Sequence, residues 1–302
     1  MNRRAVTALL AVAVLWGGTW PAGKLAAEDV PPATVAVVRF ALAFVLLWLW
    51  ARLRGRRVGL PARRDLPLVL VMGGSAVLGY NLFFLYGLRL APATDGSILV
   101  PSLIPILTTL LAWPVLGDRP PARTALGFAI AVVGLVLVVD PVGGFGSARL
   151  EGDALLVGAA FSWPWYTLAG RAATGRFGSI AANVYATGAG ALMLLPFSFA
   201  LGGWGALGQA TAGAWASVVY LGVLGTVLAF VLFYEGVREI GAARAAAFTL
   251  LVPVFGVLAS VLVLGEPLRP LLAAGGAIVL AGLWLVQRPR ASRGAAVGEL
   301  AG

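Results

Sequence analysis

Ten apolar segments constrain the fold of this chain more than any other feature of its sequence. A helix needs about 20 mostly apolar residues to cross the hydrocarbon core of a bilayer, and only short connections separate these segments. They cover residues 5–22, 33–51, 66–88, 94–116, 122–140, 153–171, 178–200, 213–236, 243–264 and 269–287. The sequence therefore predicts an all-α membrane protein with ten transmembrane helices.

The composition agrees with this class. The chain is 60% hydrophobic and 11% charged, whereas soluble domains carry about 25% charged residues. The first apolar run follows Arg3 and Arg4, as in a signal peptide, but it continues through Trp20 without a small-residue cleavage site before Lys24. We therefore expect it to be retained as the first span.

The basic residues predict the orientation of the spans. Seventeen of the 22 Lys and Arg residues fall on the side that holds the N-terminus, four fall on the other side, and Arg39 falls inside a span. Basic loops stay in the cytoplasm. We therefore expect both termini to be cytoplasmic in a bacterial inner (plasma) membrane. The net charge of +10 does not indicate nucleic-acid binding, because the basic residues form no continuous patch.

The second half of the chain repeats the first. The run 127–138 matches the run 275–286 at seven of twelve positions with a shift of 148, and Pro105 matches Pro253 at the same shift. Gly73 and Phe84 match Gly222 and Phe233 at a shift of 149. Such self-similarity indicates internal duplication.

Each half contains five predicted spans, so the second half must enter the membrane from the opposite side. This arrangement is an inverted repeat, which is typical of secondary transporters and places the substrate near the bilayer midplane. We expect one five-helix repeat over residues 1–145, a second over residues 146–290, and a cytoplasmic tail over residues 291–302.

Several of these features together resemble the drug/metabolite transporter superfamily, in its EamA-type branch. They are Trp16 to Trp20 in the first helix, Ser162 to Tyr166 in the sixth, Arg39 in the second, and a turn of Gly, an acidic residue and Pro after the fourth helix of each half. The resemblance implies a ten-helix fold and export of metabolites, often amino acids, and includes the aromatic amino acid exporters. It also implies a central cavity between the first, third, fourth, sixth, eighth and ninth helices.

Other function classes find less support in the sequence. The chain has no Cys and no His, which removes the usual nucleophile–base pairs and the commonest metal ligands. A membrane-embedded enzyme is therefore disfavoured, and we expect no cofactor, no metal site and no catalytic residue. A channel-like facilitator would need a filter or a charged ring, and the sequence shows neither. We expect a monomeric carrier in lipid that binds a small molecule.

Aromatic and polar residues within the spans are the candidate substrate site. Helix packing explains them equally well, because an intramembrane polar group needs a partner in either case, whereas a cavity wall would stack on an apolar or aromatic substrate. The candidates are Trp16, Trp20, Tyr80, Asn81, Phe84, Ser97, Trp163, Tyr166, Phe230 and Tyr234.

Three further residues are candidates for gating or structure. Arg39 is the one charge clearly inside a predicted span. It would either bind a carboxylate bidentately or snorkel outward to pair with Glu28 or Asp29; we favour a structural or gating role. Pro105 and Pro253 interrupt helices at matched points of the two halves and are candidate hinges.

The acidic residues bear on energy coupling. All twelve fall in predicted loops, tails or terminal turns; Glu235 is the deepest, and Asp153 reads as a helix N-cap. Proton-driven carriers usually hold an acidic group near the midplane. The sequence therefore predicts facilitated diffusion or exchange without a tightly coupled proton.

Overall fold

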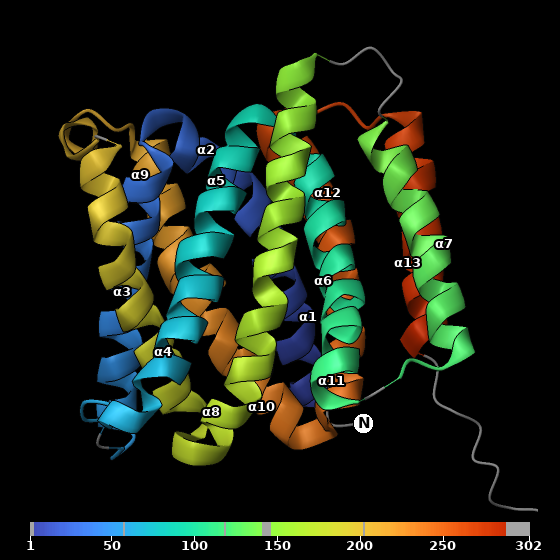
Figure 1. The fold of residues 1–302 in the computed structure, drawn as a ribbon. Coiled ribbons are helices and arrows are strands. Elements are labelled where there is room, and N and C mark those ends of the chain that lie inside the picture. The colour runs from blue at the N-terminus through green and yellow to red at the C-terminus, as the bar shows by residue number, and fades with distance from the viewer. Residues whose placement is uncertain (1–2, 57, 118, 141–145, 202, 288–302) are drawn as a thin grey trace, which may run out of the picture.

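The computed structural model describes residues 3–56, 58–117, 119–140, 146–201 and 203–287. Within these ranges every regular element is a helix, and the helices stand side by side in one bundle (Figure 1). Nine helices of the described ranges are long and apolar enough to span a membrane. The predicted all-α membrane class is confirmed, whereas the predicted tail at residues 291–302 lies outside the described residues.

The first half forms five spans close to the predicted segments. They are α1 (Arg3–Gly17) continued by α2 (Thr19–Asp29); α3 (Pro32–Leu53); η1 (Arg63–Asp65) with α4 (Leu66–Met72), the π-helical η2 (Gly73–Gly79) and α5 (Tyr80–Leu90); α6 (Ala93–Leu116); and α7 (Ala122–Val139). Pro32 begins α3, where a missing N–H costs little. Gly117 ends α6 in the left-handed region with φ of 76°, which glycine adopts without strain.

The second half repeats this order. Its elements are α8 (Ser147–Ala200), η3 (Trp204–Gly208), α9 (Ala212–Val219), the π-helical η4 (Tyr220–Leu228), α10 (Ala229–Ile240), α11 (Ala242–Phe248), η5 (Thr249–Leu251), α12 (Val252–Leu264) and α13 (Pro270–Gln287). Gly265 ends α12 with φ of 68° and is the counterpart of Gly117 at the shift of 148. The same residue type thus ends the fourth span of each half in the same conformation.

Helix α8 contains two spans rather than one. Gly178 interrupts it with φ 80° and ψ 159°, which is not helical. Tyr166 and Asn183 are joined by a hydrogen bond of 3.0 Å, although 17 residues of straight helix would separate them by roughly 25 Å. The chain must therefore fold back at Gly178. Helix α8 then supplies two passes, and the nine apolar helices of the described ranges agree with the ten predicted passes.

Helices α7 and α13 show that the two repeats are inverted. A Cβ on Gly127 would meet the carbonyl oxygen of Gly282, and a Cβ on Gly134 would meet that of Gly275; the reverse contacts hold as well. Because the residue number rises along one helix while it falls along the other, equivalent helices of the two halves pack antiparallel. Small residues permit this close approach, and Figure 1 shows the pair at one side of the bundle.

The third span of each half contains a π-helical stretch at a matched place. The shift of 149 carries η2 onto residues 222–228, which lie within η4. Side chains reach the carbonyls freed by the wider turn, because Asn81 Nδ2 donates to Ala76 O and Thr226 Oγ1 donates to Leu221 O, each five residues back. Single π-helical turns are rare and concentrate at functional sites. The π-helical stretches η2 and η4 therefore indicate that the functional site lies near the third and eighth spans.

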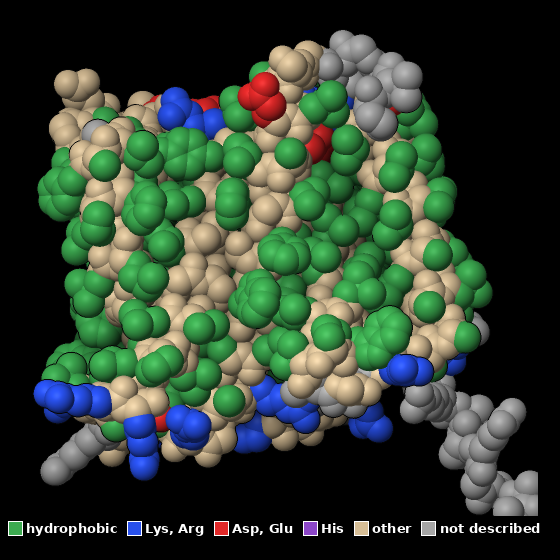
Figure 2. All heavy atoms as spheres, viewed as in Figure 1, with side chains coloured by type: hydrophobic (Ala, Val, Ile, Leu, Met, Phe, Trp, Pro, Cys, Tyr) green, Lys and Arg blue, Asp and Glu red, His purple; other side chains and the backbone are tan. Residues whose placement is uncertain are grey.

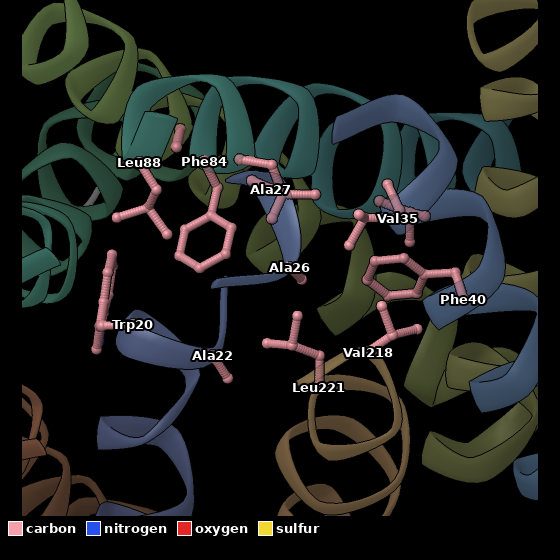
Figure 3. Packing of buried hydrophobic residues seen from close by; sticks show 14 of the residues in the cluster. Trp20, Ala22, Ala26, Ala27, Val35, Phe40, Phe84, Leu88, Val218 and Leu221 are labelled. Atoms are coloured by element: carbon pink, nitrogen blue, oxygen red, sulfur yellow. The ribbon is translucent and has the colours of Figure 1, made fainter. Parts of the chain in front are cut away.

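The two ends of the bundle differ in charge and packing. We call the end that carries Arg3 the N-terminal face and the opposite end the distal face. Blue Lys and Arg side chains line the N-terminal face, while acidic groups lie at the distal face (Figure 2). The distal half holds a dense core from α2, α3, α5, α9 and η4, in which Trp20, Phe40 and Phe84 fill the space among small aliphatic residues (Figure 3).

Three expectations about helix ends are wrong. Lys24 lies inside the first span rather than in a loop, and its ammonium donates to the carbonyls of Leu88 and Ala91. Helix α8 begins at Ser147, six residues earlier than expected, because Gly146 rather than Asp153 is its N-cap. Asp153 consequently lies inside the helix and is 2% exposed.

Candidate functional site

A groove opens on the N-terminal face between α3, α8 and α10. Its volume is about 470 Å³, which falls within the range of small-molecule sites. It is lined by Leu47, Trp50, Arg54, Arg56, Ser179, Ile180, Asn183, Phe230, Val231, Tyr234, Glu235, Val237 and Arg238. Phe230 and Tyr234 are thus the two predicted site residues that line it directly.

Five predicted aromatic residues form a continuous row, which we call the aromatic row. Trp20 of α2 contacts Phe84 of α5 with ring centroids 5.1 Å apart, and Phe84 stacks on Tyr80 at 5.7 Å. Tyr80 meets Trp163 of α8 at 5.0 Å, and Trp163 meets Tyr166 at 5.2 Å. The row therefore joins the first span, the third span and the start of the second repeat.

Asn183 connects the aromatic row to the groove. Its Oδ1 accepts a hydrogen bond from the Tyr166 hydroxyl at 3.0 Å, and its Nδ2 donates to the Tyr234 hydroxyl at 2.9 Å. Tyr234 in turn packs beside Phe230, whose ring lies 5.9 Å from that of Trp16. Sequence analysis overlooked Asn183, although an amide in the apolar segment 178–200 was a visible signal.

Arg39 of α3 joins the spans that contain η2 and η4, and thus connects the two halves of the chain. Its guanidinium donates to Asn81 Oδ1 at 2.9 Å and to Thr226 Oγ1 at 3.3 and 3.4 Å, and it lies 4.9 Å from the ring of Phe40. The expected alternative of a pair with Glu28 or Asp29 is not found among the described residues, where Asp29 instead accepts from Thr211. Neutral acceptors from two repeats therefore hold this buried cation.

The remaining candidates lie away from the groove. Ser97 is fully buried where α6 crosses α12 near Gly256, and its hydroxyl donates to the Thr94 carbonyl of its own helix. Pro105 lies inside the continuous helix α6, whereas Pro253 follows the 3₁₀ turn η5 at the start of α12. The matched prolines thus occupy different local structures in the two halves, and their hinge role stays a prediction.

A cluster of charged residues closes the distal face, and sequence analysis missed it. Asp95 at the start of α6 is fully buried and forms ion pairs with Arg149 of α8, at 2.9 Å, and with Arg269 before α13. Both oxygens of Glu266 accept N–H groups at the start of α6, from Ala93 and Thr94. The cluster therefore ties the first repeat to the second at the end opposite the groove.

These observations divide the bundle into two functional ends. The groove, the Asn183 bridge and the tyrosine hydroxyls give the N-terminal end a recess with aromatic walls and polar groups. The distal end combines a dense core with buried ion pairs. A bundle of two inverted repeats that is open at one end and closed at the other has the arrangement expected of a carrier.

Comparison with known proteins agrees with this architecture. The EamA-like transporter family matches residues 3–140 and residues 150–288. This chain belongs to the EamA-like transporter family. As a family member it is a multi-pass membrane protein and a membrane transporter, and the resemblance seen in its sequence is confirmed.

Individual relatives of this EamA family member are also transporters by name. A probable terminal-alkyne amino-acid exporter of Streptantibioticus cattleyicolor is 32% identical over 288 residues, covering 94% of each chain. The uncharacterized transporter YetK of Bacillus subtilis is 28% identical over 288 residues, covering 93% of this chain and 86% of its own. A solved crystal structure aligns over 94% of this chain and 96% of its own, with a TM-score of 0.65 and 22% identity, which shows a shared fold.

Proposed function

We propose that this EamA family member exports small metabolites, namely amino acids with aromatic or other apolar side chains, by alternating access. The observation that carries the proposal is the groove that ends on the Tyr166–Asn183–Tyr234 bridge beside the aromatic row. An aromatic wall stacks on an apolar side chain, and an amide with two hydroxyls offers hydrogen bonds to a polar group. Amino acids present both chemistries in one molecule.

The charge at the groove mouth supports a substrate that carries a carboxylate. Arg54, Arg56 and Arg238 line the mouth together with the exposed Glu235. A cleft with one predominant sign of charge raises the local concentration of ligands with the opposite charge. The likeness to a probable amino-acid exporter over nearly the whole chain points to the same class of substrate.

The orientation follows from the basic face. Because Lys and Arg gather at the N-terminal face, the positive-inside rule assigns that face to the cytoplasm of a bacterial inner membrane, with both termini inside. The groove is then open to the cytoplasm and the charge cluster closes the outer end. This conformation is the one in which an exporter loads its substrate. One bundle supplies every element of the proposed path, so the carrier would act as a monomer.

A channel-like facilitator is the second candidate. It would need a continuous path, whereas the dense distal core and the Asp95 ion pairs close the described bundle at one end. Catalysis is not needed to explain any of these features, and the named relatives are transporters.

The substrate class is tested by uptake into proteoliposomes that contain the purified protein. We expect saturable uptake of radiolabelled L-phenylalanine that excess unlabelled L-leucine reduces and excess L-lysine or L-glutamate does not. Uptake that L-lysine inhibits as strongly as L-leucine would contradict an apolar site. Empty liposomes give the background.

A further inference from the structure

Asp153 is a buried carboxylate without a hydrogen bond. It lies in the second turn of α8, is 2% exposed, and neither Oδ1 nor Oδ2 accepts a hydrogen bond. Its nearest cationic atom is Nε of Arg149, at 3.9 Å, which is beyond hydrogen-bond distance. A buried ionised carboxylate that receives no hydrogen bond is costly, and binding a proton removes the cost of the buried charge.

The groups around Asp153 favour the same protonation. Arg149 Nε is directed at Asp95, 2.9 Å away, and Arg149 NH2 donates to Val138 O at 3.2 Å. The cluster of three carboxylates (Asp95, Asp153 and Glu266) faces two guanidiniums, those of Arg149 and Arg269. The other charged groups at this end are Lys24 and the exposed Glu28 and Asp29 of α2, Arg89 of α5, Asp140 after α7 and the exposed Glu151 of α8. A proton on Asp153 leaves two carboxylates against two guanidiniums, which balances the cluster.

The position of Asp153 links this proton to a conformational change. Gly152, its neighbour in α8, packs directly on the end of α5, since a Cβ there would lie 2.6 Å from the amide nitrogen of Ala91. The ion pairs of Asp95 join α6 of the first repeat to Arg149 and Arg269 of the second. Opening of the distal end must separate these elements and admit water to Asp153, where the ionised form is stable.

We propose that Asp153 is a proton-binding site whose occupancy accompanies closure of the distal end. The inference rests on the proposed transport function, because it assigns the distal end as the outer gate. The proton comes from the outer water when the gate closes and returns to the outer water when the gate opens. It binds to one carboxylate oxygen, no other bond changes, and no proton crosses the membrane.

Proton linkage gives the direction in which pH shifts the equilibrium between the closed and open states of the distal end. The closed state binds one proton more than the open state, so acid outside favours closure and alkali favours opening. One proton changes the ratio of the two states by no more than about tenfold per pH unit. The effect depends on the outer pH alone, because Asp153 lies at the end opposite the groove.

Cysteine labelling tests the gate without any knowledge of the substrate. The chain has no Cys, and Ser97 is fully buried two residues after Asp95 in α6. We expect Ser97→Cys to react with an impermeant maleimide from outside faster at about pH 8 than at about pH 6, relative to the exposed reference Gly205→Cys, within the limit of about tenfold per pH unit. Adding Asp153→Asn should abolish this difference and keep the rate low, while Glu151→Gln should leave it unchanged.

Infrared spectroscopy of the otherwise native chain provides a second readout. We expect the C=O stretching band of a protonated carboxylic acid at about neutral pH, lost in Asp153→Asn and kept in Glu151→Gln. A band that persists in Asp153→Asn, or pH-dependent labelling that survives this substitution, would overturn the proposal. So would L-phenylalanine accumulation driven by a pH gradient and lost in Asp153→Asn, because that proton would cross the membrane. Failure of all L-phenylalanine uptake, with the labelling and infrared results as expected, would instead contradict the proposed substrate alone.

Discussion

The hydroxyl of Tyr166 donates a hydrogen bond to Oδ1 of Asn183, 3.0 Å away, across the two limbs of α8. The amide nitrogen of Asn183 donates a hydrogen bond to the hydroxyl of Tyr234. One amide therefore fixes two tyrosines, from the sixth and the eighth spans, at the inner end of the groove. A substrate that enters the groove meets this bridge before it reaches the aromatic row.

Replacement of Asn183 should weaken both folding and transport. In Asn183→Ala both tyrosine hydroxyls lose their partner. The Tyr234 side chain is exposed and can bond to water, whereas Tyr166 is more buried, and a buried polar group left without a partner costs about 1–3 kcal/mol. We expect a lower Tm in detergent and a higher KM for L-phenylalanine. Thr187→Val is the matched control on the same limb, because Thr187 bonds only to carbonyls of its own helix. Equal effects of the two substitutions would contradict the role of the bridge.

Removal of the Trp163 ring should weaken L-phenylalanine binding more than removal of the Trp165 ring. Trp163 contacts both Tyr80 and Tyr166, whereas Trp165 is 42% exposed on the outside of the bundle. Loss of an aromatic contact costs about 1 kcal/mol, which corresponds to about a fivefold increase in KM. We therefore expect Trp163→Ala, but not Trp165→Ala, to raise the KM for L-phenylalanine. The concentration dependence of L-phenylalanine uptake into proteoliposomes gives the KM of each variant.

Asn81 should be coupled to Arg39. Asn81→Ala removes the acceptor at 2.9 Å from a buried guanidinium, which we expect to lower Tm, because an unsatisfied charged donor costs more than a neutral one. In an Arg39→Met background the same change should have a smaller effect. A double-mutant cycle in thermal unfolding measures the coupling, which is about 0.5–3 kcal/mol for residues in contact. Additive effects would show that the two residues act independently.

The glycine contact of α7 and α13 should tolerate no side chain. A Cβ at Gly134 would lie 2.6 Å from the carbonyl oxygen of Gly275 and 2.8 Å from Val279. We expect Gly134→Ala to force the helices apart and to cost about 1–3 kcal/mol, as overpacking typically does. Gly175→Ala is the control, since its Cβ would meet nothing within 4 Å and alanine favours the helix. Thermal unfolding of the two variants gives the comparison.

The sequence allowed most of the fold to be predicted but less of the site. The lengths of the apolar runs located most spans within a few residues, and the matched runs 127–138 and 275–286 identified the duplication. The structure then places the matched glycines in the contact between α7 and α13. The inversion followed from the odd number of spans. These features depend on local composition and on counting, which a single sequence contains.

The errors arose where long-range contacts decide the outcome. Asp153 follows a glycine and resembles an N-cap, but Gly152 is there because α8 packs on the end of α5. The buried Asp95 and Asp153 lie in the first two turns of α6 and α8 at the distal end, not near the midplane. Transport without a tightly coupled proton therefore stays a prediction. Asn183 was missed because its partners, Tyr166 and Tyr234, lie 17 and 51 residues away.

Counterflow in proteoliposomes tests the central claim of a carrier with alternating access most directly. Vesicles loaded with unlabelled L-phenylalanine are diluted into a trace of the labelled amino acid. A carrier that exposes its site to one side at a time predicts transient accumulation of label above the level in vesicles without internal substrate. Label that only equilibrates, at a rate independent of the internal amino acid, would show an open pore and contradict the account.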